Sequence, residues 1–225
     1  MDVLYFLKQR TGFIRTLYEG SVVAFEDRIR RIKVGEEPFV PPYSEDGEPP
    51  FLLEWIEADE CRDVLGHACL SLLAASLQCY LRTSDERLSL NCGECCKSDF
   101  KQRGWLNGYR TCFRDVLNID WRSGPCDLTF LEALVLARNQ IQHPESIHTV
   151  RAKYSRRDFT KLERKFFFAG SEDMDLPYNV DAGEFTWILA PNIQVTRETL
   201  MQAVDEVEQF CTWLDAEIDA QQTAG

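Results

Sequence analysis

Histidine and long apolar runs are both scarce in this sequence. Only 3 of the 225 residues are histidine, so proton transfer near neutral pH depends on very few side chains. No stretch approaches 18 uncharged apolar residues, which argues against a membrane-spanning helix. The first eight residues, MDVLYFLK, carry an acid at position 2 and lack a small-residue cleavage site. We therefore expect no signal peptide, no membrane contact and a cytoplasmic location.

Basic residues are outnumbered by acidic ones. Lysine and arginine number 25 against 37 aspartates and glutamates, which gives a net charge of −12. This balance argues against a protein that coats nucleic acid or an anionic membrane with its whole surface, but it leaves room for a local basic site. Hydrophobic residues make up 44% and aromatic residues 12% of the chain, which excludes disorder and provides for a substantial core.

The nine cysteines are an odd number and are spread along the chain. Without a signal sequence, we expect them to be reduced thiols. One Cys-x-x-Cys pair, Cys92 and Cys95, lies in a polar loop expected over 84–97. A structural zinc site needs four ligands, so folding would have to supply the others from Cys112, Cys126 or His67. Ordinary loop thiols explain the pair more simply, and we expect no metal and no cofactor.

The apolar periodicity predicts a mainly α-helical protein with one domain over 1–225. Helices are expected over 2–33, 51–82 and 99–118, from Asp127 or Thr129 to residue 143, and over 196–222. Thr196 is the expected N-cap of the last helix. Residues 151–195 are less regular, and short β candidates at 166–168 and 185–189 predict a small β-hairpin before that helix.

A polar cluster closes the helix that is expected to end at residue 143. Arg138 falls on the apolar stripe of this helix, four residues after Leu134 and seven after Leu131. An arginine facing a core or an interface must find a partner, because an unpaired buried guanidinium is costly. Asn139 follows directly, and His143 lies at the helix end. A permanent cation, an amide and a group that titrates near neutrality can hold a phosphodiester and move a proton. The alternative is an arginine paired inside the fold and a histidine that caps helix carbonyls.

The segment Arg138-Asn139-x-x-x-His143 resembles the R-x4–6-H motif of HEPN domains, with a long apolar helix upstream and an amphipathic helix downstream. Many members of this family are metal-independent endoribonucleases of toxin–antitoxin and antiviral systems. The resemblance implies an antiparallel HEPN-like helical bundle, an RNA substrate and no cofactor. It also implies a homodimer whose composite active site places two motifs face to face, with an antitoxin or defence protein as a further partner.

The resemblance assigns a role to each residue of the motif. His143 is expected to act as general base on the RNA 2′-OH or as general acid for the leaving 5′ oxygen. Arg138 would hold the scissile phosphate, and Asn139 would orient either side chain or the substrate. The expected products are a 2′,3′-cyclic phosphate and a 5′-OH. In family toxins paired with nucleotidyltransferase antitoxins, the modified tyrosine lies two residues after the histidine. Glu145 stands there in this chain, which argues against that form of control at this position.

A second match to the same spacing runs from Arg62 through Asp63 to His67. It lies in the middle of a predicted helix, and Asp63 and His67 have the i,i+4 spacing of a helix-surface pair. We therefore place the catalytic site at Arg138, Asn139 and His143 and interpret the earlier match as structural.

A basic stretch follows the motif. Residues 150–166 carry seven basic and two acidic side chains. The residues expected to bind RNA are Arg151, Lys153, Arg156 and Arg157. Tyr154 lies among them and is expected to stack on a base. A solvated basic loop paired with the acidic C-terminal region explains the same charges equally well. Two functions therefore stay open: an endoribonuclease effector, and a catalytically silent HEPN-like module for dimerisation or for binding RNA or protein.

Overall fold

The structure is a computed structural model that describes residues 2–42, 49–90, 93–144, 152–154, 166–167 and 192–224. The expected features that lie outside these ranges are the strand at 185–189, residue 168 of the strand at 166–168, Cys92, Glu145, Arg151, Arg156 and Arg157. Within the described ranges there is no strand, and an isolated antiparallel bridge joins Lys153 to Asn192. The described part of the chain is mainly α-helical, as predicted, and the β-hairpin stays a prediction.

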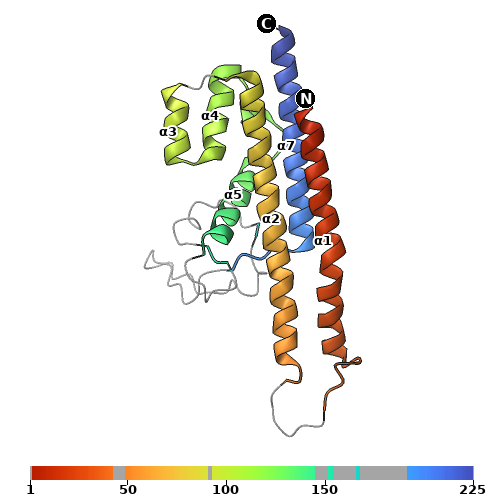
Figure 1. Cartoon of the computed structure of the whole chain (residues 1–225). Coiled ribbons are helices and arrows are strands. Elements are labelled where there is room, and N and C mark those ends of the chain that lie inside the picture. Colours follow the sequence, from red (N-terminus) through yellow and green to blue (C-terminus); the bar gives the residue numbers. More distant parts are fainter. Residues whose placement is uncertain are drawn as a thin grey trace.

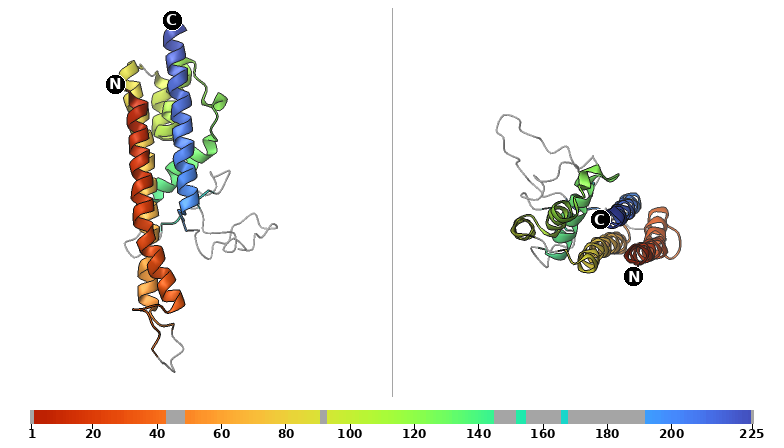
Figure 2. Two further views of the ribbon diagram at one scale, coloured as in Figure 1. Left: turned by 90° about the vertical axis from the view of Figure 1, so that its right-hand side faces the viewer. Right: turned by 90° about the horizontal axis from the view of Figure 1, so that it is seen from above.

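Three long helices form the frame of the molecule: α1 (Val3–Val34), α2 (Leu52–Leu88) and α7 (Arg197–Ala224). α1 and α2 make an antiparallel hairpin, and α7 packs against both, running in the same direction as α2 (Figures 1 and 2). Three ion pairs join α1 to α7: Arg15 to Asp205 and Arg197 to Glu19, each at 2.6 Å, and Arg15 to Glu208 at 3.7 Å. The acidic C-terminal helix is therefore held partly by an arginine of α1.

The shorter helices follow α2 in the chain: α3 (Glu94–Gln102), α4 (Trp105–Leu117), the 3₁₀ turn η1 (Trp121–Ser123) and α5 (Leu128–Gln142). The single helix expected over 99–118 is thus two helices, and part of the loop expected over 84–97 is helical. The break lies at Gly104, whose φ of 86° falls in the left-handed region that glycine adopts readily. α2 also continues to Leu88 instead of ending at residue 82.

The helix starts predicted from capping residues are confirmed. The Asp127 carboxylate accepts a hydrogen bond from the Thr129 N–H at 2.9 Å at the start of α5. The Thr196 hydroxyl accepts from the Thr199 N–H at 3.2 Å, and the Thr196 carbonyl accepts from the Leu200 N–H at 3.0 Å. These bonds satisfy N–H groups that have no partner inside the helix, so local chemistry fixes both starts.

A continuous hydrophobic core joins α1, α2, α4, α5 and α7. Trp121 lies inside it, with its ring centroid 4.8 Å from that of Phe210 and 5.9 Å from that of Phe113. Among the described tryptophans Trp121 is fully enclosed, whereas Trp55 and Trp213 are only half-buried.

α2 is long and apolar enough, by length and composition alone, to cross a membrane. An 18-residue window of this helix has a mean hydropathy of 1.5 with at most two charged residues. The expectation of no membrane contact rested on uninterrupted apolar runs and did not anticipate this window. Because 56% of the window is buried against the rest of the fold, it has the character of a core helix, and it is weak evidence for a membrane span.

Candidate functional site

α5 carries the predicted motif on its last turn and is held in place by its apolar face. The buried residues of this helix, which packs against α2 and α7, are Phe130, Leu131, Ala133, Leu134 and Ala137. Helical geometry stops at His143, whose φ is −126° and ψ is 62°, although its N–H still donates to the Asn139 carbonyl at 3.1 Å. Pro144 disfavours helical geometry in the residue before it. The end of the helix therefore lies where the sequence predicted.

Arg138 and Asn139 are joined by a hydrogen bond at this end. Nη1 of Arg138 donates to Oδ1 of Asn139 at 3.0 Å, and both side chains are half-buried. The prediction placed Arg138 on the apolar stripe, but the last buried residue of that stripe is Ala137, and the arginine lies at its edge. A guanidinium has five N–H donors, so it can hold an anion and an amide at the same time.

His143 is the exposed member of the set. On an ideal helix, five residues separate two positions by about 140° around the axis and about 7.5 Å along it. In the described part of one protomer, no hydrogen bond joins the imidazole to Arg138 or Asn139. The structure thus brings Arg138 and Asn139 together but does not bring His143 to them, and the imidazole lies exposed at the end of the helix. An exposed imidazole can act as general acid or base toward a bound ligand.

The polar residues of the second sequence match, from Arg62 to His67, form structural contacts inside the molecule. His67 is only 6% exposed, and its Nε2 lies 2.9 Å from the carbonyl oxygen of Ile193. Because a carbonyl only accepts, Nε2 carries the proton in this hydrogen bond. Arg62 forms an ion pair with Asp59 at 2.6 Å. The interpretation of His67 as half of a surface pair is wrong, because the side chain is a buried anchor between α2 and the segment before α7.

Gly66 allows the chain to approach α2 at this anchor. A Cβ at this position would lie 2.8 Å from the carbonyl oxygen of Val195, a distance that real Cβ contacts do not show. Residues 192–195 therefore pack directly on the backbone of α2. Sequence reasoning missed this site. The only local signal was a glycine followed by a histidine inside a long apolar helix, and nothing in that pattern points to a partner 126 residues away.

One of the four residues expected to bind RNA lies in the described part of the chain. Lys153 is exposed, and its backbone pairs with Asn192. Tyr154 was expected to stack on a base, but it is 2% exposed, and burial raises the pKa of its phenol. The stacking prediction is wrong because Tyr154 belongs to the core. Lys153 is left as an accessible cation on the segment that leads away from α5.

The cysteines that the sequence offered as zinc ligands fall in different surroundings, and Cys92 lies outside the described residues. Cys112 is disulfide-bonded, so the expectation of nine reduced thiols is wrong at this position. Burial raises the pKa of Cys126 to about 12, which keeps this thiol protonated, whereas the thiolate is the metal ligand. Among the described residues, no group of three or more His, Cys, Asp or Glu side chains is placed to hold a metal. Cys61 is an exposed free thiol.

Comparison with known proteins places the chain in no family. No family model, curated protein or solved structure matches it. Its function has to be argued from the side chains at the end of α5.

Proposed function

We propose that the protein is a metal-independent endoribonuclease of the HEPN type that acts as a toxin or antiphage effector. Its catalytic set is Arg138, Asn139 and His143. The observation that supports this proposal is the last turn of α5, where a half-buried guanidinium is held by an amide at 3.0 Å and an exposed imidazole ends the helix. These groups stand at the exposed end of a helix whose other face is buried in the core.

Each group has a defined task in cleavage of the phosphodiester. An imidazole removes the proton of the 2′-OH, and the resulting oxygen attacks the adjacent phosphorus. Arg138 offers its N–H donors to the phosphate oxygens, on which negative charge accumulates in the transition state. The P–O5′ bond breaks, and the leaving oxygen takes a proton to become a 5′-OH. The other product is a 2′,3′-cyclic phosphate. Asn139 fixes the guanidinium so that little reorganisation is needed on binding.

Two proton transfers at one phosphodiester favour a site built from two protomers. The base must be neutral and the acid protonated in the same turnover, and the motif supplies one imidazole per chain. Two chains that face each other would contribute one His143 as base and the other as acid. We therefore propose a homodimer with a composite site as the active form.

The direct test compares wild type with His143→Ala on total RNA in EDTA. Gln142→Ala is a matched control, because Gln142 is the exposed neighbour on the same turn. We expect wild type and Gln142→Ala to cleave alike, and His143→Ala to lose about 10²-fold or more, the usual contribution of a general acid or base. New ends should be 5′-OH groups that a polynucleotide kinase labels without prior phosphatase treatment.

Circular dichroism of the three proteins must show equal helix content, since His143 caps the end of α5. Equal cleavage by all three, or cleavage by none under these conditions, would remove His143 from the catalytic role. Growth arrest on expression, relieved by Arg138→Ala, would support the toxin assignment specifically.

A mixing experiment tests the composite site. Wild-type and His143→Ala protomers are mixed in equal amounts, unfolded together and refolded, so that about half of the dimers keep a single imidazole at the shared site. Because that site needs one His143 as base and the other as acid, these mixed dimers should be inactive, and the mixture should keep about a quarter of the wild-type rate. A mixture that keeps about half of the rate, as expected for protomers that act independently, contradicts a site shared between chains.

A second candidate is a catalytically silent HEPN-like module that binds RNA or protein. The buried Tyr154 favours it, because this removes the aromatic expected to stack on a base. Under this alternative, wild type binds RNA without producing 5′-OH ends, and Lys153→Glu weakens that binding while His143→Ala does not.

A further inference from the structure

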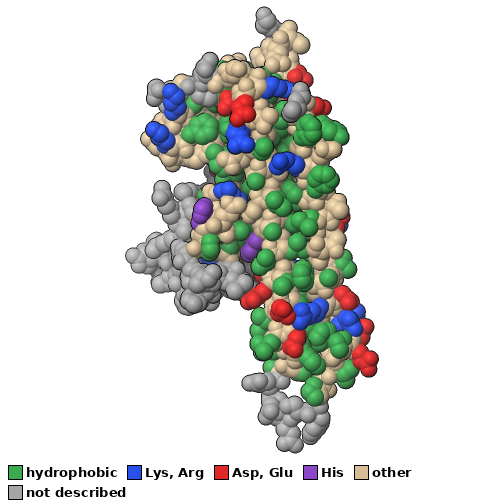
Figure 3. Space-filling view, viewed as in Figure 1, with side chains coloured by type: hydrophobic (Ala, Val, Ile, Leu, Met, Phe, Trp, Pro, Cys, Tyr) green, Lys and Arg blue, Asp and Glu red, His purple; other side chains and the backbone are tan. Residues whose placement is uncertain are grey.

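α1 and α2 share a long uncharged face that the other described helices leave open (Figure 3). Phe13 is 69% exposed, Val64 52%, Leu72 47% and Leu17 44%. The exposed positions between them are small and uncharged: Gly20, Ala24, Ala68 and Ala75. A groove of about 660 Å³ between the two helices runs into this face, lined by Phe25, Ile56, Val64 and Ala68 among others. In a chain with 28% charged residues, an uncharged surface of this length is unusual and marks an interaction site.

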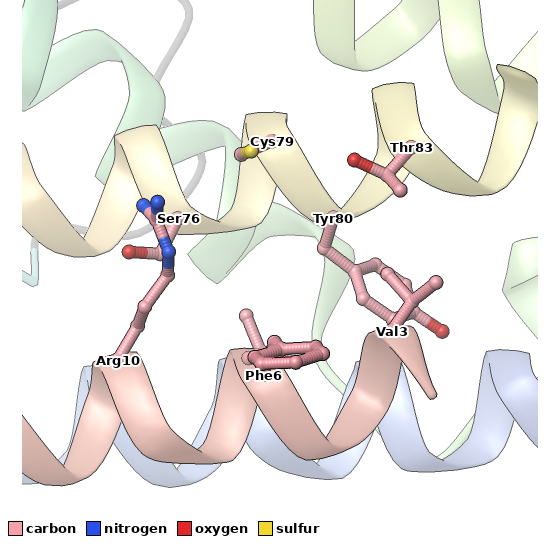
Figure 4. Close-up of a pocket in the computed structure, with 8 residues that line it drawn as sticks. Val3, Phe6, Arg10, Ser76, Cys79, Tyr80 and Thr83 are labelled. Atoms are coloured by element: carbon pink, nitrogen blue, oxygen red, sulfur yellow. The ribbon is translucent and has the colours of Figure 1, made fainter. Parts of the chain in front are cut away.

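Opposite charges flank the two ends of this face. Arg10 lies at one end, where it extends from α1 toward Ser76 of α2 (Figure 4). Glu60 lies at the other end and lines the groove. Its neighbour Glu57 is paired with Arg28 at 2.8 Å. Within the part of the chain that the structure describes, neither Arg10 nor Glu60 has an ion-pair partner. The protomer therefore presents a cation and a carboxylate at opposite ends of an apolar strip.

We propose that this face binds a second copy of the chain, with the two hairpins antiparallel. A two-fold axis perpendicular to the helices places Arg10 of each protomer at the end where the other protomer has Glu60. The dimer therefore contains two Arg10–Glu60 pairs. Arg10 is level with Ser76, which lies about 24 Å along α2 from Glu60 at 1.5 Å per residue. The midpoint is Ala68. A small side chain at the crossing point lets two helices approach closely.

The size of the face is adequate for a specific dimer. From Cys61 to Cys79 the exposed positions of α2 carry no charge over about 27 Å, and two neighbouring helices are about 20 Å wide. Two such faces bury about 1,100 Å² in total, which exceeds the roughly 1,000 Å² expected of a biological interface. Because the interface is uncharged, the acidic side chains of the two chains stay apart, which limits their electrostatic repulsion.

A second copy fits this face better than a foreign partner does. An isologous two-fold interface requires one patch to complement itself, so both signs must be present at mirrored distances from its centre. Arg10 and Glu60 meet that condition about Ala68. A membrane surface would match the apolar residues but would leave Glu60 without a partner, and the net charge of −12 opposes anionic lipid.

The arrangement also has a consequence for the end of α5. α5 packs beside the middle of α2, on the side away from α1 (Figures 1 and 2). A two-fold axis across the helices through Ala68 keeps the two α5 helices on the same flank of the dimer. The interface is argued independently of the proposed ribonuclease function. Only a composite site formed by the two α5 helices rests on that function.

The test measures the mass of the full chain by sedimentation equilibrium and multi-angle light scattering. The protein concentration runs over about 1–100 µM, which spans typical dimer dissociation constants. Wild type is expected to be a dimer. Ala68→Glu places two carboxylates against each other at the axis and should yield a monomer, as should Phe13→Lys. Val23→Glu is the matched control: Val23 is 61% exposed on the other side of α1, and this variant should stay dimeric. Circular dichroism confirms that each variant is folded.

Charge exchange tests the register. Arg10→Glu and Glu60→Arg should each weaken the dimer by roughly tenfold, because two ion pairs become two like-charge contacts. The double variant Arg10→Glu/Glu60→Arg restores the complement and should recover the wild-type dissociation constant. A monomeric wild type overturns the proposal, including one that co-floats with phosphatidylcholine vesicles. So does a dimer that survives both Ala68→Glu and Phe13→Lys, or a double variant weaker than either single one.

RNA cleavage in the same samples separates this proposal from the catalytic one. A dimer that does not cut RNA keeps the interface and removes the ribonuclease. A monomeric wild type that cuts RNA keeps the catalytic roles of Arg138, Asn139 and His143 but removes both the interface and the composite site.

Discussion

Arg62–His67 and Arg138–His143 have the same spacing, yet the fold uses them in opposite ways. In the first segment the arginine is paired with Asp59 at 2.6 Å, and the histidine is buried against the Ile193 carbonyl at 2.9 Å. In the second, the arginine contacts only its neighbour Asn139 among the described residues, and the histidine is exposed. The polar groups of the first segment are paired inside the molecule, whereas we propose that those of the second bind a ligand.

The difference comes from where each segment lies in its helix. Gly66 and His67 occupy the middle of α2, where neighbouring elements pack on every turn of the buried face. Arg138 and His143 lie at the C-terminal end of α5, where Pro144 disfavours helical geometry in the residue before it. A spacing of two residue types is therefore weak evidence by itself, and the termination of the helix is the stronger part of the motif.

The largest expected effect separates the two arginines by activity. Arg138→Ala should reduce RNA cleavage by about 10²- to 10³-fold, the usual cost of removing one group that stabilises transition-state charge. Arg62→Ala should leave cleavage within about twofold, since Arg62 serves an ion pair inside α2. Both are measured as initial rates on one labelled RNA. Arg138→Lys keeps the charge but loses the planar donor array, so it should recover only part of the rate. Equal losses of cleavage rate from Arg62→Ala and Arg138→Ala would show that the two arginines do not differ in their role in cleavage.

The next effect separates the two histidines by stability. His67→Ala leaves the Ile193 carbonyl without its buried donor and opens a space at the anchor, so the free energy of unfolding should fall by about 2 kcal/mol. His143→Ala removes an exposed side chain and should change it by less than about 0.5 kcal/mol. Urea unfolding followed by circular dichroism gives both values. A larger loss for His143→Ala than for His67→Ala would reverse the assignment of which histidine is structural.

These two outcomes also show what the sequence could and could not predict. The end of α5 was predictable because Asp127, Pro144 and the apolar period are local signals. The break at Gly104 was missed because the apolar pattern runs through it, and only the close contact of Gly108 with Phe100 reveals two packed helices. The burial of His67 and Tyr154 depends on partners far away in the chain, which no local pattern encodes. For the same reason Arg138 was placed on the buried stripe when it lies at its edge.

A smaller effect tests the close approach at Gly66. In Gly66→Ala the new Cβ meets the Val195 carbonyl at 2.8 Å, and the clash outweighs the gain in helix propensity, so unfolding free energy should fall by about 1 kcal/mol. Gly12→Ala is the matched control, because a Cβ there meets nothing within 4 Å. It should stabilise α1 by up to about 1 kcal/mol. Two stabilising substitutions would mean that residues 192–195 do not pack on α2 as described.

The smallest effect concerns the ion pair that makes Arg62 unavailable. The Arg62 side chain is 32% exposed and that of Asp59 is 11% exposed, so the pair is partly screened and Arg62→Ala should cost only about 0.5 kcal/mol of unfolding free energy. Raising the salt concentration from 50 mM to 500 mM should shrink this difference between wild type and variant, because the Debye length falls from about 14 Å to about 4 Å. Urea titrations at the two salt concentrations measure it. A cost above about 2 kcal/mol that salt does not change would mean that Arg62 stabilises the fold through buried packing. Arg62 would then differ from Arg138 in its burial and not in its ion pair with Asp59.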